Sequence, residues 1–348
     1  MQPDPRLLVR YVPRLASEWE YDAPGRDWQE IDSTLCFVDL SGFTALSERL
    51  ARLGRIGAEE LTEVLNRVFG EMLDVANAHG GSLAKFGGDA LLLHYAGEDH
   101  ALHAAAAAIE MRSALRRAAQ HKTSVGRVAL RMSVGVHTGV VNLFRVGRSH
   151  TELVVSGPAA SRVALMESIA EAGEILISPE TAARLPPSAL GAHKGEGILL
   201  RWRRAPIGPV DIRLRRDVDY DAVQRGVPLA LRRVLGQDAI EPEHRLATVG
   251  FVKFEGVDEI MADNGQEAVA AALHELVTNV QAAADRAGVT FLATDVDKNG
   301  GKVILVAGVP FTQDDDDGRM LSAVREILDA KTWLRVRAGV NRGHVFAG

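Results

Sequence analysis

The stretch that decides the fold is TLCFVDLSG at residues 34–42, because a related stretch occurs again later in the chain. The second occurrence is TVGFVKFEG at residues 248–256. A further pair follows in the same order, since RMSVGVHTG at residues 131–139 matches RVRAGVNRG at residues 335–343. The chain has 348 residues, which is more than one compact core usually holds. Two ordered matches therefore indicate two related domains.

Hydrophobic periodicity predicts the same order of elements in both copies. The first copy predicts a strand over 35–40, helices over 44–52 and 58–78, a hairpin at Gly87 and Gly88, a helix over 99–119, strands over 128–137, 140–145 and 152–155, and a helix from Pro158. The second copy predicts a strand over 247–254, a helix over 266–287, a hairpin over 290–307, a helix over 319–330 and a strand over 334–341. We therefore predict an α+β fold with helices against one face of each sheet.

The repeat divides the chain into four predicted segments. They are an N-terminal helical segment over 1–30, a first domain over 31–185, a linker over 186–244 and a second domain over 245–348. The second domain ends before the short strands and helix that follow this point in the first, so we expect it to be C-terminally incomplete. The linker is interpreted as a solvated segment with some strand character rather than an anion or partner site. It carries six clustered arginines, Arg201, Arg203, Arg204, Arg213, Arg215 and Arg216.

Composition excludes several classes of function. The formal net charge is −6, with 40 Lys and Arg against 46 Asp and Glu, so the basic excess of nucleic-acid-binding proteins is absent. The first 17 residues are interrupted by proline and arginine, and no apolar stretch is long enough to cross a bilayer. The single cysteine, Cys36, stands in an apolar strand and is interpreted as a core residue rather than a nucleophile. We expect a cytoplasmic protein without nucleic-acid or membrane partners.

Two aspartates carry the functional signal. Asp39 stands in an apolar strand directly before a glycine turn that opens a helix, and a lone buried carboxylate is costly unless a cation or donors compensate it. Asp89 stands on a hairpin turn between two apolar strands. If that hairpin pairs with the Asp39 strand, the two carboxylates meet and repel unless metal lies between them, which predicts a two-metal phosphoryl-transfer site. The alternative is that Asp39 caps the helix at Thr44 and Asp89 serves only the turn.

Three motifs, FVDLSGFT at 37–44, KFGGDA at 85–90 and VHTG at 136–139, resemble the class III nucleotidyl cyclases and, within them, the tandem bicarbonate-responsive soluble adenylyl cyclases. The resemblance implies two ferredoxin-like cyclase homology domains that pair within one chain as an intramolecular pseudo-dimer, so that the protein is a monomer. It also implies conversion of ATP to cyclic AMP and pyrophosphate. It implies two Mg²⁺ or Mn²⁺ ions as cofactors and a nucleoside triphosphate, with ATP favoured, as substrate. The implied metal site is Asp39 and Asp89 with the Leu40 carbonyl, and the implied triphosphate site is the amides of Gly42, Phe43 and Thr44.

The resemblance also implies two sites between the copies, which the sequence makes unequal. The first site keeps both aspartates, but Thr294 stands at the base-reading position where the family has a lysine. In the second, Lys253 replaces the first aspartate and Gly300 roughly replaces the second. An ammonium group cannot ligate Mg²⁺, so the second site cannot use two-metal chemistry. The family's asparagine and arginine positions hold Ser161 and Leu165 in the first copy and would lie beyond residue 348 in the second. We therefore expect little cyclic nucleotide from this chain alone.

Two lysines leave alternatives open. Lys85 and Lys253 would form a degenerate or regulatory site for bicarbonate or another anion, or they would pair with Asp89 or Asp297 and stabilise the expected interface. A catalytically silent nucleotide- or anion-binding regulatory module is the alternative function. A diguanylate cyclase is disfavoured by the Ala90 and Leu91 that follow the GGD sequence.

Two further features are interpreted as structural. His137 occupies a turn after a strand, at a position that carries no chemistry in the family. The acidic run over 314–317 precedes a predicted helix, where carboxylates favour the N-terminus, so a solvated helix cap is preferred to a calcium loop.

Overall fold

The computed structural model describes residues 4–118, 122–127, 130–210, 218–235 and 243–347, which fall into two compact units. Unit 1 comprises Met1–Glu30, Asn142–Pro158 and Arg215–Gly348, and unit 2 comprises Ile31–Val141 and Ala159–Leu214. Residue 119 of the predicted helix, residues 128–129 of the predicted strand and the arginines at 213, 215 and 216 lie outside the described residues.

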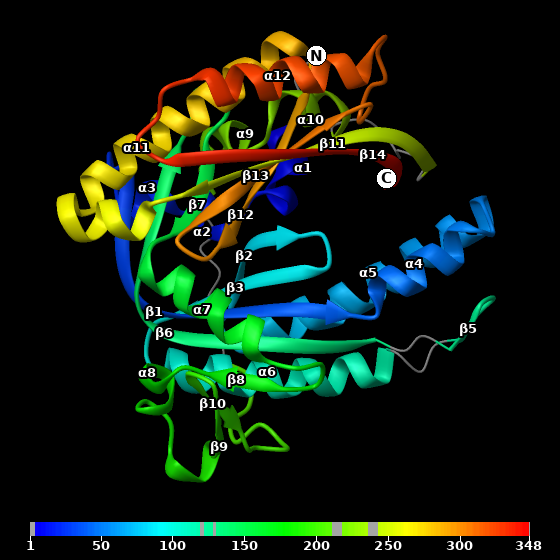
Figure 1. The fold of residues 1–348 in the computed structure, drawn as a ribbon. Coiled ribbons are helices and arrows are strands. Elements are labelled where there is room, and N and C mark those ends of the chain that lie inside the picture. Colours follow the sequence, from blue (N-terminus) through cyan, green and yellow to red (C-terminus); the bar gives the residue numbers. More distant parts are fainter. Residues whose placement is uncertain (1–3, 119–121, 128–129, 211–217, 236–242, 348) are drawn as a thin grey trace. The chain divides into compact units, whose positions relative to one another are not determined.

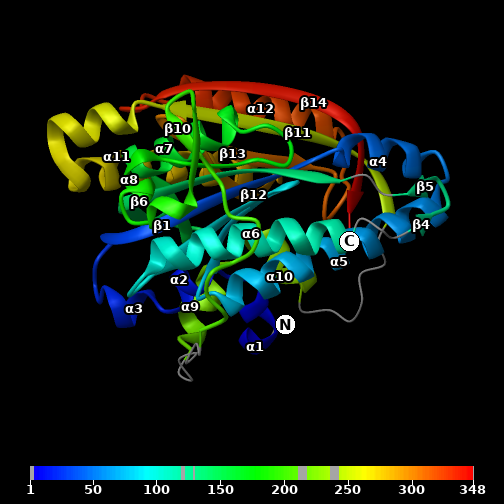
Figure 2. The same cartoon turned by 90° about the horizontal axis from the view of Figure 1, so that it is seen from below.

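Unit 2 is built on a mixed sheet with helices α4 (Phe43–Ala51), α5 (Arg55–Ala78) and α6 (His100–Ala118). Its strand order is β2 (Ser82–Gly87), β3 (Ala90–Ala96), β1 (Trp28–Ser41), β6 (Arg131–Val146), β8 (Ile175–Ile177), β10 (Gly197–Leu200) and β9 (Leu190–Lys194). Alternate residues of β1, such as Val38 and Leu40, are buried with Met72 of α5 in one apolar core. Helices α5 and α6 run side by side (Figure 2).

The remaining elements of unit 2 extend this sheet. Helix α7 (Pro158–Ile169) packs against β6 at Gly135, where a Cβ atom would lie 2.3 Å from the Glu167 nitrogen. The predicted linker contains β9 and β10, of which β10 pairs with both β8 and β9. The smaller elements are α8 (Pro179–Ala182), the 3₁₀ helix η2 (Pro187–Ala189), β4 (Lys122–Thr123) and β5 (Gly126–Arg127).

Unit 1 holds the second copy. Its sheet has the order β12 (Thr290–Asp297), β13 (Gly300–Ala307), β11 (Glu243–Glu255) and β14 (Arg335–Ala347). Helices α11 (Val257–Ala287) and α12 (Asp316–Asp329) pack against one face of that sheet and bury Val252 and Phe254 of β11 (Figure 1). Helix α11 begins at Val257 rather than at the predicted residue 266, because two helices meet at Gly265, whose φ of 81° interrupts the helical backbone.

Strand β6 is longer than predicted. The sequence predicts two strands over 128–137 and 140–145, whereas β6 runs without a break from Arg131 to Val146. Thr138, at the predicted interruption, is buried and its hydroxyl lies 2.8 Å from the Thr34 hydroxyl of β1. From Asn142 onward β6 belongs to unit 1, where it pairs with β7 (Glu152–Ser156). We call residues 142–158 the arm.

The N-terminal segment contributes short helices to unit 1. These are α1 (Pro5–Leu8), the 3₁₀ helix η1 (Val9–Tyr11), α2 (Arg14–Ser17) and α3 (Trp19–Asp22). Leu8 and Val12 pack with Val223 and Val227, which lie in and after α9 (Tyr220–Arg225), and α10 (Leu229–Leu235) follows. Across the described chain, none of the helices combines the length and the apolar character needed to span a membrane.

Candidate functional site

Asp39 and Asp89 lie at the same end of two paired strands. Strand β1 pairs antiparallel with β3, and this register places Asp39 opposite Ala90. The Leu40 amide donates to the Asp89 carbonyl oxygen over 3.0 Å, so the pairing continues into the turn. Both aspartates are partly buried. The predicted pairing of the Asp39 strand with the Asp89 hairpin is therefore confirmed.

The helix that follows Asp39 begins at a glycine turn. Gly42 is the N-cap of α4 with φ 91°, a left-handed conformation that few residues with a Cβ atom adopt. The first amides of a helix have no partner within the helix, and together with the helix dipole they favour an anion. Gly42, Phe43 and Thr44 thus lie directly after the Asp39 strand, at a helix start suited to phosphate oxygens.

A third carboxylate, which the sequence analysis missed, lies near the two aspartates. Glu167 on α7 accepts a hydrogen bond of 2.8 Å from the Ser133 hydroxyl. Burial raises the pKa of Glu167, and the negative charges of Asp39 and Asp89 raise it further. No local sequence signal marks Glu167, because only the packing of α7 on β6 brings it to this place.

Within the described ranges, no group of three or more His, Cys, Asp or Glu side chains is arranged to hold a metal ion. The carboxylates of Asp39 and Asp89 lie at this end of the sheet, with the Glu167 carboxylate near them. Lys85 lies on β2 of the same hairpin, where it is buried and opposite Leu92.

The second copy has a similar strand and glycine turn, but Lys253 stands where the first copy has Asp39. Lys253 of β11 lies opposite Lys302 of β13. Lys253 also stands three residues before Gly256, the N-cap of α11, whose φ is 111°. The Lys253 Nζ atom lies 2.8 Å from Asp297 Oδ2 and 3.3 Å from Glu255 Oε1. The ion pair between Lys253 and Asp297, considered above as an alternative, is therefore present.

Thr294, at the predicted base-reading position, is buried in unit 1 against the arm. Its amide and its hydroxyl donate to the same Glu152 oxygen, over 3.0 Å and 2.6 Å. The other Glu152 oxygen lies 3.6 Å from His150 Nε2. The sequence analysis missed this contact, because Glu152 and Thr294 are far apart in the chain.

The features interpreted as structural from the sequence are structural in the fold. Cys36 is fully buried, and burial raises the pKa of its thiol to about 12, which leaves it unreactive. His137 is buried within β6 and not in the predicted turn, which was wrong because the strand continues to Val146. Its Nδ1 atom lies 2.9 Å from the Ser178 hydroxyl, and burial lowers the pKa of His137 to about 4. Asp315 caps α12, since its side chain accepts from the Gly318 amide over 3.1 Å.

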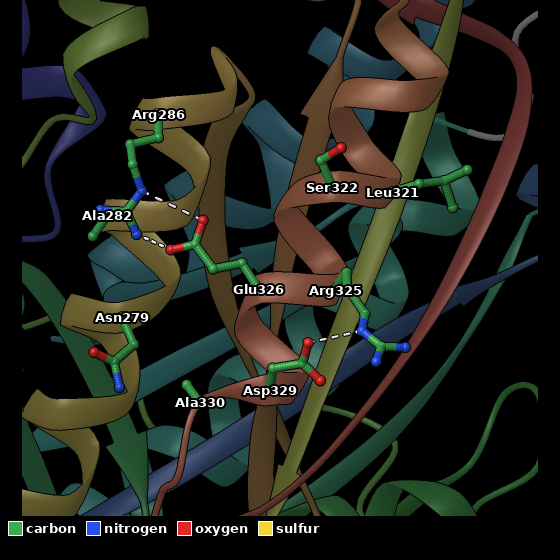
Figure 3. Close-up of a pocket in the computed structure, with 9 residues that line it drawn as sticks. All are labelled: Asn279, Ala282, Arg286, Leu321, Ser322, Arg325, Glu326, Asp329 and Ala330. Atoms are coloured by element: carbon green, nitrogen blue, oxygen red, sulfur yellow. Dashed lines mark hydrogen bonds and ion pairs between the residues drawn. The ribbon is translucent and has the colours of Figure 1, made fainter.

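A groove of about 810 Å³ lies in unit 1 between α11 and α12 (Figure 3). Its charged side chains are paired with one another, Arg286 with Glu326 and Arg325 with Asp329. The groove is lined by none of the site residues predicted from the sequence, so it is not the candidate site.

Comparison with known proteins agrees with this geometry. Residues 28–200 match the profile of the family described as "Adenylate and Guanylate cyclase catalytic domain". Adenylate cyclase type 10 from Homo sapiens is 29% identical over 163 residues, which cover 45% of this chain and 10% of that protein. The rabbit protein of the same name, from Oryctolagus cuniculus, is 28% identical over 181 residues, or 50% of this chain and 11% of that protein. The chain thus spans about a tenth of the length of these relatives.

Two solved structures extend the comparison. The adenylyl cyclase CyaB from P. aeruginosa is 27% identical and covers 53% of this chain and 100% of its own, with a TM-score of 0.44. A class III adenylyl cyclase-like ATP-binding protein from Pseudomonas aeruginosa is 12% identical, with a TM-score of 0.59 over 92% of this chain and 76% of its own. The latter shows a shared fold over nearly the whole chain. Residues 28–200 of this chain thus form a domain of the adenylate and guanylate cyclase family, the class III nucleotidyl cyclases.

Proposed function

We propose that this chain is an adenylyl cyclase that converts ATP to cyclic AMP and pyrophosphate at a site built on Asp39 and Asp89. The observation that carries the proposal is the register of β1 and β3, which places Asp39 beside the Asp89 turn, directly before the glycine that opens α4. ATP is favoured as the substrate because the relatives in two species are named adenylate cyclases.

The residues at this point fit divalent metal ions. Mg²⁺ and Mn²⁺ prefer oxygen ligands, and the carboxylates of Asp39 and Asp89 with the Leu40 carbonyl form an all-oxygen donor set. Two such ions, when bound, would supply the positive charge that lowers the pKa of the ribose 3′-hydroxyl and neutralises the triphosphate.

The chain's own groups then bind and orient the substrate. The amides of Gly42, Phe43 and Thr44 at the start of α4 would hold the triphosphate oxygens. The 3′-oxygen of the substrate forms the new bond to the α-phosphorus, the bond from that phosphorus to the bridging oxygen of the β-phosphate breaks, and the 3′-hydroxyl proton is lost to solvent. No protein nucleophile is needed, which agrees with the buried and unreactive Cys36.

We propose that a small anion such as bicarbonate regulates the protein by binding at Lys85. The second lysine of the predicted anion site, Lys253, holds Asp297 and Glu255 instead. We also propose that the protein is a monomer of low activity, because both copies of the repeat are present in one chain but Thr294 replaces the base-reading lysine.

The test is cyclic AMP formation from ATP with Mn²⁺. Asp39→Asn and Asp89→Asn should each lower the rate by at least about 10²-fold, because each removes an anionic metal ligand. Asp74→Asn on the exposed surface of α5 makes the same charge change and should leave the rate unchanged. Equal rates for wild type, Asp39→Asn and Asp89→Asn would refute the proposed site.

A second candidate function is nucleotide binding without turnover. It is favoured by Thr294, whose hydroxyl already donates to Glu152 and is not the lysine that the family uses to read a purine. Calorimetry with Mn²⁺ and a non-hydrolysable ATP analogue separates the two functions, since a silent module would bind the analogue and still form no cyclic AMP.

A further inference from the structure

Lys253 and Asp39 occupy the same structural position in the two copies. Each stands on a strand that pairs with the second strand of a hairpin, β1 with β3 and β11 with β13. Each also lies three residues before a glycine in the left-handed conformation at the start of a helix. The equivalence therefore follows from backbone geometry as well as from the sequence repeat. One copy presents a carboxylate at this point, and the other presents an ammonium group.

The Lys253 ammonium group lies between two carboxylates. Its Nζ atom is 2.8 Å from Asp297 Oδ2, at the end of β12, and 3.3 Å from Glu255 Oε1, at the end of β11. All three side chains are about one-third exposed or less. The hydrogen bond with Asp297 is the main cause that raises the pKa of Lys253, so the ammonium group stays charged.

The neighbouring charges are balanced as well. Arg337 of β14 lies 2.7 Å from Glu255, and Lys302 of β13 lies 2.9 Å from Asp295. The local network contains three carboxylates, Glu255, Asp295 and Asp297, and three cations, Lys253, Lys302 and Arg337. No net negative charge is left in this network to attract a metal ion. The turn also contacts the arm, because the Ser156 hydroxyl donates to the Gly300 carbonyl over 3.3 Å.

We propose that the Lys253 ammonium group takes, in the second copy, the place of a divalent cation, so that Asp297 and Glu255 are held together without metal. This inference concerns unit 1 only and does not depend on catalysis at Asp39. A divalent cation requires anionic oxygen ligands, and the carboxylates that would supply them here already bind an internal cation. It follows that a single substitution at Lys253 should convert the turn into a metal site.

The experiment measures Mn²⁺ binding by electron paramagnetic resonance in a parent protein carrying Asp39→Asn and Asp89→Asn, in which the first site is disabled. Adding Lys253→Asp should give one Mn²⁺ site per chain, bound at least about tenfold more tightly than any site in the parent. Adding Lys331→Asp, an exposed position after α12, makes the same charge change and should add no site. Lys253→Arg keeps the cation and should also add none.

Several results would overturn the inference. One is a Lys253→Asp protein that binds Mn²⁺ no better than the parent, and another is equal binding by the Lys331→Asp control. If Lys253→Asp does not fold, Lys253→Gln in the same parent replaces it. The expected result is a lowered thermal midpoint that Mn²⁺ restores. A thermal midpoint that does not respond to Mn²⁺ would contradict the inference. Mn²⁺ binding by the unmodified chain tests the proposed function separately, because it depends on Asp39 and Asp89.

Discussion

At the scale of single residues, the two copies differ most at Asp39 and Lys253. Asp39 lies beside Asp89 and close enough to Glu167 to raise the pKa of that third carboxyl group. Lys253 is instead neutralised by its ion pair with Asp297. The carboxylates gathered near Asp39 and the balanced charges around Lys253 are the reasons why we propose metal ions for the first copy alone.

Glu167 provides a prediction about stability and pH. Its pKa is raised in the folded state, so folding favours the protonated form, and unit 2 loses stability as the pH rises from the ordinary carboxyl range through the raised pKa. Glu167→Gln should remove this loss and raise the thermal midpoint in EDTA at pH 7 by about 2–4 °C, which corresponds to roughly 1 kcal/mol. At pH 4 the two proteins should melt together. A lower midpoint for Glu167→Gln at pH 7 would contradict the prediction.

His137 predicts the opposite dependence on pH. Its pKa falls to about 4 in the folded protein, against about 6.5 for an unperturbed histidine, so the neutral form is favoured by folding. The contribution of neutral His137 to the free energy of unfolding is fully present above pH 6.5. It is lost as the pH falls towards 4, at up to about 1.4 kcal/mol per pH unit. Urea unfolding at pH 7 and pH 5 should show that His137→Gln loses less free energy of unfolding between these pH values than wild type does. An equal loss in both proteins would contradict the lowered pKa of His137.

At this scale the sequence predicts only what is local. The pairing of Asp39 with the Asp89 hairpin followed from two apolar strands around a glycine turn, and the structure confirms it. The burial of Cys36 followed from its apolar neighbours. Glu167 and Glu152 were missed because each reaches its partner only through packing between distant parts of the chain.

At the scale of elements, the arm is the part of the first copy that packs with the second. Phe144, Val146 and Val154 share one apolar core with Val252 and Phe254 of β11. Gln281 of α11 is buried and accepts hydrogen bonds from the Arg148 and Ser149 amides, over 2.7 Å and 3.1 Å. The second copy thus depends on an element that lies outside its own stretch of sequence.

The arm predicts the effect of removing Glu152. Glu152→Ala leaves the buried amide and hydroxyl of Thr294 without this acceptor, which should lower the free energy of unfolding by about 1–3 kcal/mol. Glu267→Ala, at an exposed position of α11, is the matched control and should be neutral. Chemical denaturation measures both proteins, and equal stability of the two would show that the contact does not hold the arm.

The elements themselves were predicted where their hydrophobic period was regular. Helix α5, the β2–β3 hairpin and the strands β11 to β13 lie close to their predicted ranges. The errors lie beside glycines: Gly139 falls between the two predicted strands that β6 joins, and Gly265 directly precedes the predicted start of the helix at residue 266. Tertiary pairing continues β6 through its glycine, whereas α11 contains a true break in the helical backbone at Gly265.

At the scale of the whole molecule, the chain divides into two compact units, and Asp39 and Asp89 of the candidate metal site lie in unit 2. Residues 28–200 match the cyclase family, and a solved structure shares the fold over 92% of the chain. Two related domains, inferred from two motifs that recur in order, stay a prediction. The sequence repeat could not predict that the arm belongs to the unit of the second copy, since the arm is continuous in sequence with the first.

The most direct test of the account is a crystal structure of the protein with Mn²⁺ and a non-hydrolysable ATP analogue, measured for the anomalous scattering of manganese. We predict anomalous density between the carboxylates of Asp39 and Asp89, with the triphosphate at the first amides of α4, and none beside Lys253. Manganese bound between Asp297 and Glu255, or an analogue bound without any metal at Asp39 and Asp89, would contradict the account.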